Sequence, residues 1–350
     1  MKINSVNTVS LGEVLEYEQP TKYIVDNTNY DDKFDIPVLT AGKSFLLGYT
    51  NETHNVFSNV PVIIFDDFTT AFKYVDFPFK VKSSAMKILK ANKEIADIRF
   101  LYYRMMKTGI DTELHKRYWI SKYSKLKIPL PPIDQQKKIA AILDAADAYR
   151  QKTKALITKY DALTQSLFLD MFGDPVSNPK GWGIFSFKDV LEIRNGKNQK
   201  LIENKNGIYP ICGSGGVMSY GDNYISEADS VIIGRKGNIN KPILMKEKYW
   251  HVDTAFGLNP IRYVLEHDYL YWFCVRYNFE QHNKTVTIPS LTKETLLRIK
   301  IPIPPIELQN QFAERVQAIE AQKAQTQASL AQAEDLFDSL LQRAFKGELV

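Results

Sequence analysis

The stretch that decides the architecture is LKIPLPPIDQQ at residues 126–136, because it returns as IKIPIPPIELQ at residues 299–309. The residue numbers of the two copies differ by 173 throughout, as those of Lys127 and Lys300 do. This offset is close to half of the 350-residue chain. Because a repeat at a fixed offset is the signature of a repeated structural unit, we interpret the chain as an internal duplication.

Shorter matches precede each copy of this stretch, in the same order along the chain. They pair Val14-Leu15-Glu16 with Val190-Leu191-Glu192, Ile36-Pro37-Val38 with Tyr209-Pro210-Ile211, Val62-Ile63-Ile64 with Val231-Ile232-Ile233, and Phe100-Leu101-Tyr102-Tyr103 with Tyr269-Leu270-Tyr271-Trp272. We therefore divide the chain into two globular domains, 1–128 and 178–301. Each is followed by a region that opens with prolines and continues as a helix, 129–177 and 302–350.

The two globular domains have the composition of compact α+β domains. Short runs of β-branched and aromatic residues, such as 60–65 and 230–233, alternate with Gly, Asn and Asp turns. In the linking stretches, prolines are expected to prevent both a helix and a strand ladder and to force an extended chain. A helix should then start near Asp134 and near Glu307, since acidic residues suit a helix N-terminus.

From those acidic residues onward, apolar residues recur in alternating steps of four and three, which is a heptad seam. The first seam contains Ile139, Leu143, Ala146, Ile157, Tyr160 and Leu167, and the second contains Phe312, Val316, Ile319, Leu330, Phe337 and Leu340. Polar residues interrupt both at equivalent places, Arg150 with Thr153 and Lys323 with Thr326. They either fix the register of the helices or leave a solvated gap.

Each helix is predicted to have about 35–40 residues and a length of about 55–60 Å, which suits a spacer. If the two helices pair antiparallel, the molecule acquires an internal pseudo-two-fold axis. The predicted fold class is therefore α+β, with two pseudo-symmetric α/β domains separated by two long antiparallel coiled-coil helices. A pseudo-two-fold arrangement of diverged domains suits a DNA target with two different half-sites.

Composition excludes several classes of protein. The 45 Lys and Arg against 40 Asp and Glu give a net charge of +5, which permits a nucleic-acid partner without requiring one. No run approaches the roughly 18–20 apolar residues of a membrane span, and the first residues lack a signal-peptide pattern, so we expect a cytoplasmic protein without a membrane partner. Cys212 and Cys274 are too few for a disulfide framework or a zinc site and are expected to be buried thiols.

The sequence contains no convincing catalytic motif. An adenine methyltransferase needs an Asn/Asp-Pro-Pro-aromatic tetrapeptide, and Asn259-Pro260-Ile261-Arg262 lacks the second proline and the aromatic residue. The glycine-rich stretch 213–216 lacks the Gly-Lys-Ser/Thr of a phosphate-binding loop, and the five histidines have no metal-ligand spacing. We predict a non-catalytic chain that binds no cofactor or metal.

The order of globular domain, Pro-Pro-Ile stretch and long helix, repeated twice, resembles the DNA specificity (S) subunit of Type I restriction-modification systems. The final Phe345-Lys346-Gly347-Glu348-Leu349 adds to the resemblance, which covers essentially the whole chain. It implies that 1–128 and 178–301 are target recognition domains, each reading one half of a bipartite sequence. It further implies that the helices act as spacer and docking site.

The resemblance also implies the partners. They are double-stranded DNA, two methyltransferase (M) subunits that bind S-adenosylmethionine and methylate adenine, and motor-nuclease (R) subunits in systems that restrict unmodified DNA. Two alternatives remain open on the residues alone. The chain could be the specificity subunit of a Type II-like system that both cuts and methylates, or a coiled-coil scaffold for other proteins.

The strongest candidate for DNA contact is the loop 234–241, which resembles the Gly-Arg/Lys-x-Gly-x-Ile-Gly loop of such domains, with Asn replacing the last Gly. Its cations suit phosphate or guanine and its two Asn side chains suit adenine; the alternative is a solvated charged hairpin. The candidates in this loop are Arg235, Lys236, Asn238, Asn240 and Lys241.

The equivalent loop of the first domain starts with Asp66 and Asp67, which suggests a different base set, for instance Asp accepting from cytosine. The candidates here are Thr69, Thr70, Lys73 and Tyr74. Weaker candidates are Lys43, Tyr49, Thr50 and Asn51 in the first domain and Ser214, His251 and Thr254 in the second.

Overall fold

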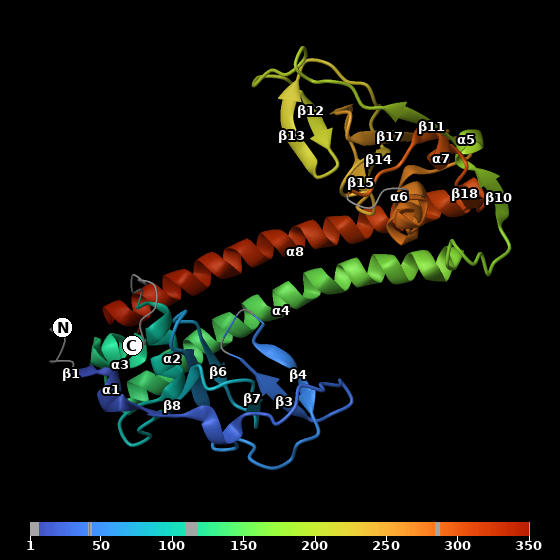
Figure 1. Ribbon diagram of the computed structural model, residues 1–350. Helices are drawn as coiled ribbons and strands as arrows, with labels where there is room; N and C mark the ends of the chain where they lie inside the picture. The colour runs from blue at the N-terminus through green and yellow to red at the C-terminus, as the bar shows by residue number, and fades with distance from the viewer. Residues whose placement is uncertain (1–6, 41, 43, 109–117, 284–287, 350) are drawn as a thin grey trace. The chain divides into compact units, whose positions relative to one another are not determined.

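The computed structural model describes residues 7–40, 42, 44–108, 118–283 and 288–349 (Figure 1). The chain divides into two compact units. The first consists of Met1–Lys152 with Ser329–Val350, and the second of Thr153–Ala328. Each unit therefore contains one globular domain together with a part of each long helix.

The first domain contains two sheets and a two-stranded ribbon. Its elements are β1 (Asn7–Ser10), α1 (Leu11–Val14), β2 (Leu15–Glu18), η1 (Pro20–Tyr23), β3 (Ile36–Leu39), β4 (Leu46–Thr50), β5 (Val62–Asp66), β6 (Phe72–Val75), β7 (Lys80–Val81), β8 (Met86–Ala91), α2 (Ile98–Met106), α3 (Tyr118–Ser121), η2 (Tyr123–Lys125) and β9 (Lys127–Leu130). The strand orders are β2-β8-β5-β6, β4-β3-β7 and β1-β9.

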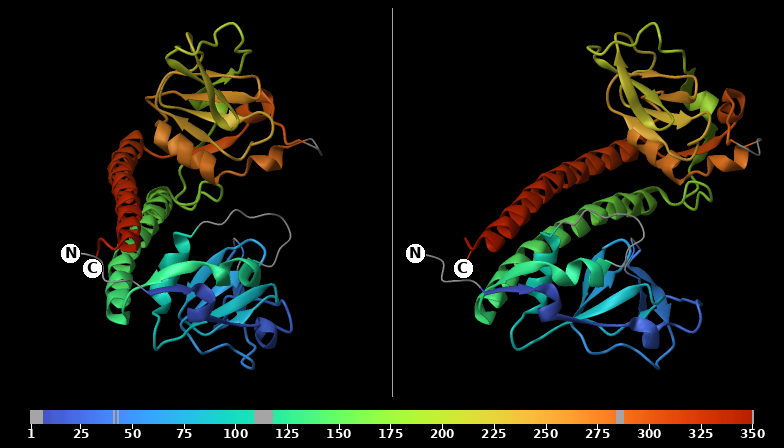
Figure 2. Two further views of the ribbon diagram at one scale, coloured as in Figure 1. Left: turned by 90° about the vertical axis from the view of Figure 1, so that its left-hand side faces the viewer. Right: turned by 60° about the vertical axis from the view of Figure 1, so that its left-hand side comes forward.

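The second domain repeats this arrangement strand for strand (Figures 1 and 2). Its elements are β10 (Gly183–Ser186), α5 (Phe187–Val190), β11 (Leu191–Asn195), β12 (Tyr209–Gly213), β13 (Gly216–Gly221), β14 (Ser230–Gly234), β15 (Ile243–Met245), β16 (Trp250–His251), β17 (Ala255–Pro260), α6 (His267–Arg276), η3 (Phe279–His282), α7 (Lys293–Leu297) and β18 (Lys300–Ile303). The strand orders are β11-β17-β14-β15, β13-β12-β16 and β10-β18. The predicted duplication and the α+β class are confirmed.

Alternating side chains place each four-stranded sheet between two cores, since successive residues of a strand point to opposite faces. In β5, Ile63 and Phe65 join the core under α2, whereas Val62 and Ile64 pack toward the three-stranded sheet. In the second domain, the residues of β14 divide in the same way, so each sheet is covered by helices on one face and by the smaller sheet on the other.

The expectation that prolines would prevent a strand ladder is wrong. Residues Lys127–Leu130 form β9 and pair antiparallel with β1, with Pro129 opposite Thr8. Residues Lys300–Ile303 form β18 and pair with β10, with Pro302 opposite Ile184. A ribbon of two strands leaves one edge of each strand unpaired, and proline is tolerated where its missing N–H faces that edge.

The helices have nearly the predicted length and starting points. They are α4 (Ile133–Phe172), with 40 residues, and α8 (Ile306–Lys346), with 41. Each starts one residue before the acidic residue that was predicted to lie near its N-terminus. None of the predicted seam residues is exposed.

Contacts within the second unit show that the helices pair antiparallel. Asp161 of α4 pairs with Lys323 of α8, and Phe172, further along α4, packs edge-on against Phe312, nearer the start of α8. In the first unit, the start of α4 shares a core with the end of α8, including Leu143 and Leu341. An antiparallel helix pair therefore contributes to the core of each unit.

The cations that interrupt the seams have defined partners. Lys323 Nζ donates to Asp161 Oδ1 on the other helix at 2.5 Å. Arg150 pairs with Asp147 of its own helix, and its guanidinium lies 4.2 Å from the ring centre of Phe337 on α8. Because both cations contact the facing helix, they favour a role in fixing the register over a solvated gap.

The repeated Pro-Pro-Ile stretch ends in a glutamine with a clear structural role. Gln136 is fully buried. Its Oε1 accepts from Asp97 N at 2.8 Å, and its Nε2 donates to Ile95 O at 2.9 Å and to Pro131 O at 2.8 Å. Asp97 is the N-cap of α2. A single side chain thus ties the first turn of α4 to the start of α2.

The second copy reproduces this arrangement. Gln309 is also fully buried. Its Oε1 accepts from Glu266 N at 2.9 Å, and its Nε2 donates to Val264 O at 3.1 Å and to Pro304 O at 2.8 Å. Glu266 is the N-cap of α6. The recurrence of the glutamine at the same place in both repeats follows from this shared connection between domain and helix.

Replacing Gln136 or Gln309 with alanine is expected to lower the free energy of unfolding by about 1–3 kcal/mol, because buried backbone groups lose their partners. Gln135→Ala is the matched control, since Gln135 is exposed on the same turn. Urea unfolding of the full chain checks this. Equal midpoints for Gln136→Ala and Gln135→Ala would contradict the proposed structural role.

Both cysteines are buried, as predicted. Burial raises the pKa of the Cys212 thiol to about 12 and also raises the pKa of Cys274. Both are therefore neutral thiols at physiological pH. Among the described residues, no helix is both long and apolar enough to cross a membrane.

Candidate DNA-binding site

The basic loop of the second domain is anchored by its backbone. It follows β14, whose last residue, Gly234, pairs with Ala255 at the start of β17. Arg235 N and Lys236 N both donate to Thr254 O, at 2.8 and 3.3 Å. Ile239 is buried in the domain core. These contacts fix the loop while the side chains of Arg235, Lys236 and Asn238 remain exposed.

A second basic loop lies at the same end of the sheet and was missed in the sequence. It follows β11 and carries Lys197, Asn198 and Lys200, all exposed. Lys197 N donates to His251 O at 3.0 Å, which places the loop beside the segment that leads to β17. The stretch Asn-Gly-Lys-Asn-Gln-Lys at 195–200, with two cations and no acid, was the available signal.

Close packing explains the glycine in this second loop. A Cβ atom at Gly196 would lie 1.8 Å from Val252 O, so a larger residue would displace the backbone. The loop can approach the β16–β17 connection only with glycine at this position.

The cations of these two loops have no carboxylate partner among the residues that the structure describes. Lys197, Lys200, Arg235 and Lys236 form no ion pair there, although Arg235 also donates to Asp253 O at 3.4 Å. Exposed cations without a neighbouring acid can neutralise phosphates, which is the main source of affinity for DNA. The Asn side chains beside them have the donor and acceptor that adenine requires.

The two asparagines of the loop have different surroundings. Asn240 Nδ2 donates to Asn278 Oδ1 at 3.0 Å, and Asn240 Oδ1 accepts from Phe279 N at 2.7 Å. Its amide holds the loop against η3. Asn238 is exposed beside the turn at Gly215. Asn238 is therefore the better candidate for reading a base.

Two predicted DNA contacts are corrected by burial. His251 is fully buried, with its Nε2 3.1 Å from Arg194 O, and burial lowers its pKa to about 4. It is a neutral core residue. Thr50 is also fully buried, and its Oγ1 accepts from Glu52 N at 3.3 Å. Neither side chain can reach a DNA duplex from this position.

The proposal that an acidic residue of the first domain accepts from cytosine is also corrected. Asp66 Oδ1 accepts from Phe68 N at 2.8 Å and from Thr69 N at 3.0 Å, so this carboxylate closes its own turn. Asp67 is buried and accepts from Trp119 N at 2.8 Å. Both acids stabilise the loop, which explains why the loop starts with acidic residues.

The remaining candidates divide by exposure. Asn51, Thr69, Lys73 and Lys241 are exposed, whereas Tyr49, Thr70, Tyr74, Ser214 and Thr254 are partly buried. The ring of Tyr74 lies under the guanidinium of Arg99, 4.1 Å from its centre, which gives it a packing role. Lys43 lies outside the described residues.

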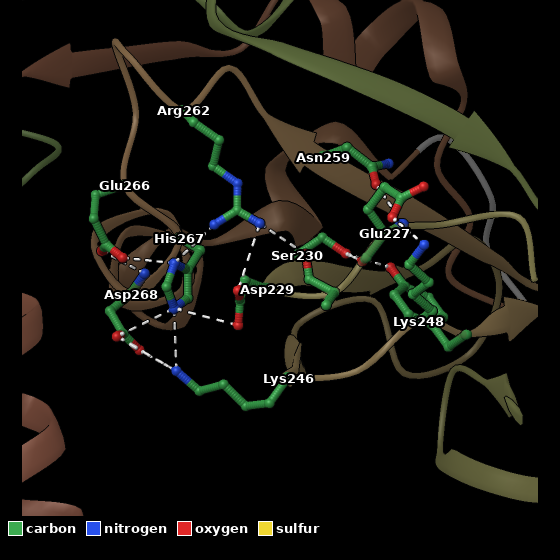
Figure 3. A network of polar contacts seen from close by, with 12 residues as sticks. Glu227, Asp229, Ser230, Lys246, Lys248, Asn259, Arg262, Glu266, His267 and Asp268 are labelled. Carbon is green, nitrogen blue, oxygen red and sulfur yellow. Dashed lines mark hydrogen bonds and ion pairs between the residues drawn. The ribbon is translucent and has the colours of Figure 1, made fainter. Parts of the chain in front are cut away.

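At the end of the second domain opposite the two basic loops, charged side chains neutralise one another (Figure 3). Lys246 Nζ lies 3.2 Å from both Asp268 Oδ1 and His267 Nε2. Glu266, His267 and Asp268 could together hold a metal ion, but the Lys246 ammonium already supplies a cation there. In the described part of the chain, the cations of the loops 195–200 and 235–241 have no carboxylate partner. They lie at the end of β14 that is opposite to this neutralised network.

Replacing Arg235 and Lys236 with alanine is expected to weaken DNA binding about ten- to hundredfold at low salt and to reduce the slope of log affinity against log salt by about 2. Lys188→Ala with Lys293→Ala is the charge-matched control, since both lysines are exposed on the helices α5 and α7. Fluorescence anisotropy at several salt concentrations checks this. An unchanged slope would remove the loop from the DNA contacts.

Comparison with known proteins decides the family. The sequence profile of the Type I restriction modification DNA specificity domain matches twice, at residues 4–159 and 179–335. The chain belongs to this family. Each match begins in a globular domain and extends into the helix that follows it, so one family domain corresponds to one repeat.

Two relatives are specificity subunits. The chain is 46% identical over 171 residues to the Escherichia coli Type I restriction enzyme EcoR124I/EcoR124II specificity subunit, a match that spans 47% of this chain and 41% of that subunit. It is 24% identical over 289 residues to the Type I restriction enzyme MjaVIII specificity subunit of Methanocaldococcus jannaschii, spanning 69% of this chain and 67% of that one.

Two solved structures show the same fold. The S subunit of a Type I restriction-modification system from M. genitalium matches with a TM-score of 0.66 at 15% identity, over 99% of this chain and 98% of that chain. A chain from a study of assembly and conformational transition in the type I R-M system matches with a TM-score of 0.56 at 18% identity, over the full length of both.

Proposed function

We propose that the chain is the DNA-reading specificity subunit of a Type I restriction-modification enzyme and has no active site of its own. The observation that carries this proposal is the duplication. A family domain for DNA specificity occurs twice, with one strand order and one glutamine connection to its helix. Two similar domains with different loops suit a target of two different half-sites.

Each recognition domain reads one half-site through its loops. In the second domain, the loops 195–200 and 235–241 supply cations for phosphate and Asn238 for a base. At the equivalent place, the end of β5, the first domain has Asp66 and Asp67, which stabilise their own loop and supply no cation. This divergence supports different base preferences for the two halves of the target.

The long helices serve as spacer and as docking site for two methyltransferase subunits. S-adenosylmethionine is bound by those partners, which methylate adenine in the target, and motor-nuclease subunits join where the system also restricts DNA. The modest net charge of +5 agrees with a division of the electrostatic contacts among the subunits.

The test is a methylation assay with the chain and its cognate methyltransferase subunit. Plasmid DNA treated with the complex is sequenced for methyladenine. We expect methylation at one bipartite sequence with an unread spacer, and none with the methyltransferase subunit alone. If the complex forms but methylates no bipartite sequence, the proposal is wrong and a scaffold role is favoured.

A further inference from the structure

The two recognition domains share a bulged hairpin. In the first domain, Val38 pairs with Gly48 and Leu39 with Leu46, which leaves Leu47 as the extra residue of β4. In the second, Ile211 pairs with Ser219 and Cys212 with Val217, which leaves Met218 as the extra residue of β13. The bulge therefore occurs at the same position in both copies.

Both bulges carry a pair of apolar residues at the surface. Leu46 is 43% exposed, Val217 is 53% exposed and Met218 is 63% exposed, while Leu47 is partly buried. β-bulges redirect side chains and are common beside functional sites. Packing within the domain leaves about half of the Leu46, Val217 and Met218 side chains in solvent, where they are free to contact a partner.

In the second domain, the apolar pair lies next to the basic loop. Met218 covers the end of β12, since a Cβ at Gly213 would lie 2.8 Å from Met218 Sδ. The following turn contacts the loop, because a Cβ at Gly234 would lie 3.1 Å from Ser214 Cβ. Met218 and the basic loop that carries Arg235 and Lys236 thus lie against the same short turn at 213–215.

We propose that Val217 and Met218 read thymine methyl groups in the major groove of the second half-site. The major groove admits a two-stranded ribbon, and the C5 methyl of thymine is an apolar group that Val and Met can contact there. The adjacent cations favour an anionic partner over a protein surface. This inference rests on the proposed function and names residues that give it specificity.

The experiment removes the thymine methyl from the DNA. After methylation sequencing has given the target, each thymine of the second half-site is replaced in turn by deoxyuridine in a duplex bound by the full complex. The variants are Val217→Ala with Met218→Ala, and the control Ile184→Ala, an exposed apolar residue of β10. Thermal unfolding confirms that each variant is folded.

For the wild type and Ile184→Ala, we expect deoxyuridine at one or two positions to weaken binding about fourfold per methyl. The double variant should bind thymine and deoxyuridine duplexes equally well. Three outcomes would overturn this inference and leave the proposed function intact. They are equal sensitivity of binding to deoxyuridine in the double variant and the wild type, no thymine whose replacement weakens binding, and a second half-site without thymine. The inference would also be overturned if the double variant no longer copurified with the methyltransferase subunit but still discriminated thymine from deoxyuridine. A wild-type complex without sequence-specific methylation would contradict the proposed function as well.

Discussion

Replacing Lys80 with methionine is expected to lower the free energy of unfolding of the first domain by about 3–5 kcal/mol, since it leaves a buried charge without its partner. Lys80 is fully buried in β7, and its Nζ lies 2.7 Å from Glu52 Oε2. Glu52 also accepts from Asp26 N and Asn27 N. The pair joins β7 to the connection between β4 and β5.

Lys82→Met is the matched control, because Lys82 is exposed two residues further along. The double variant Lys80→Met with Glu52→Gln should recover part of the lost stability, because it leaves no lone charge. Thermal and urea unfolding of the full chain measure these differences. Equal unfolding midpoints for Lys80→Met and Lys82→Met would contradict the structural role of the ion pair.

This pair also predicts a pH dependence. Burial alone would raise the pKa of Glu52, but the Lys80 ammonium and the backbone N–H groups of Asp26 and Asn27 outweigh it and hold the pKa below its ordinary value. A lowered folded-state pKa means that the stabilisation is present above the unfolded value of about 4.3 and is lost as the pH falls through the folded value. Glu52→Gln should lack this component of acid sensitivity.

Inserting one heptad into each helix, after Lys152 in α4 and after Ala328 in α8, is expected to widen the unread spacer by about three base pairs. Seven helical residues add about 10 Å, and base pairs are about 3.4 Å apart. A whole heptad preserves the phase of the seam. Methylation sequencing should then show unchanged half-sites around a longer spacer.

An insertion into α4 alone is the control. It shifts one seam against the other and separates pairs such as Asp161 and Lys323, so it should abolish specific methylation. Unchanged spacer length after the double insertion would show that the helices do not set the distance between the half-sites.

Much of the fold could be predicted because its signals are local or repeated. The Pro-Pro-Ile stretch and the heptad steps located α4 and α8 to within one residue of their starts. The ladder of β9 could not be predicted, because its partner β1 lies more than a hundred residues earlier and the open edge of the ribbon tolerates Pro129. The role of Gln136 was equally hidden, since its partners Ile95 and Asp97 lie about 40 residues away.

The candidate site was less predictable because residue type does not reveal exposure. His251 has suitable chemistry for DNA, but it is fully buried in the two-residue strand β16. Asn240 has a suitable amide, but its Oδ1 already accepts a hydrogen bond from Phe279 N of η3. Lys197 and Lys200 were missed because they become neighbours of the basic loop only when β11 pairs with β17.

The central claim is that each recognition domain reads one half-site. Residues 1–125 are replaced by the equivalent domain of another Type I specificity subunit with a known target, and the methylated sequence is determined with the same methyltransferase subunit. We predict that one half-site changes to that of the donor, while the other half-site and the spacer remain the same. A change in both half-sites, or in neither, would contradict the claim.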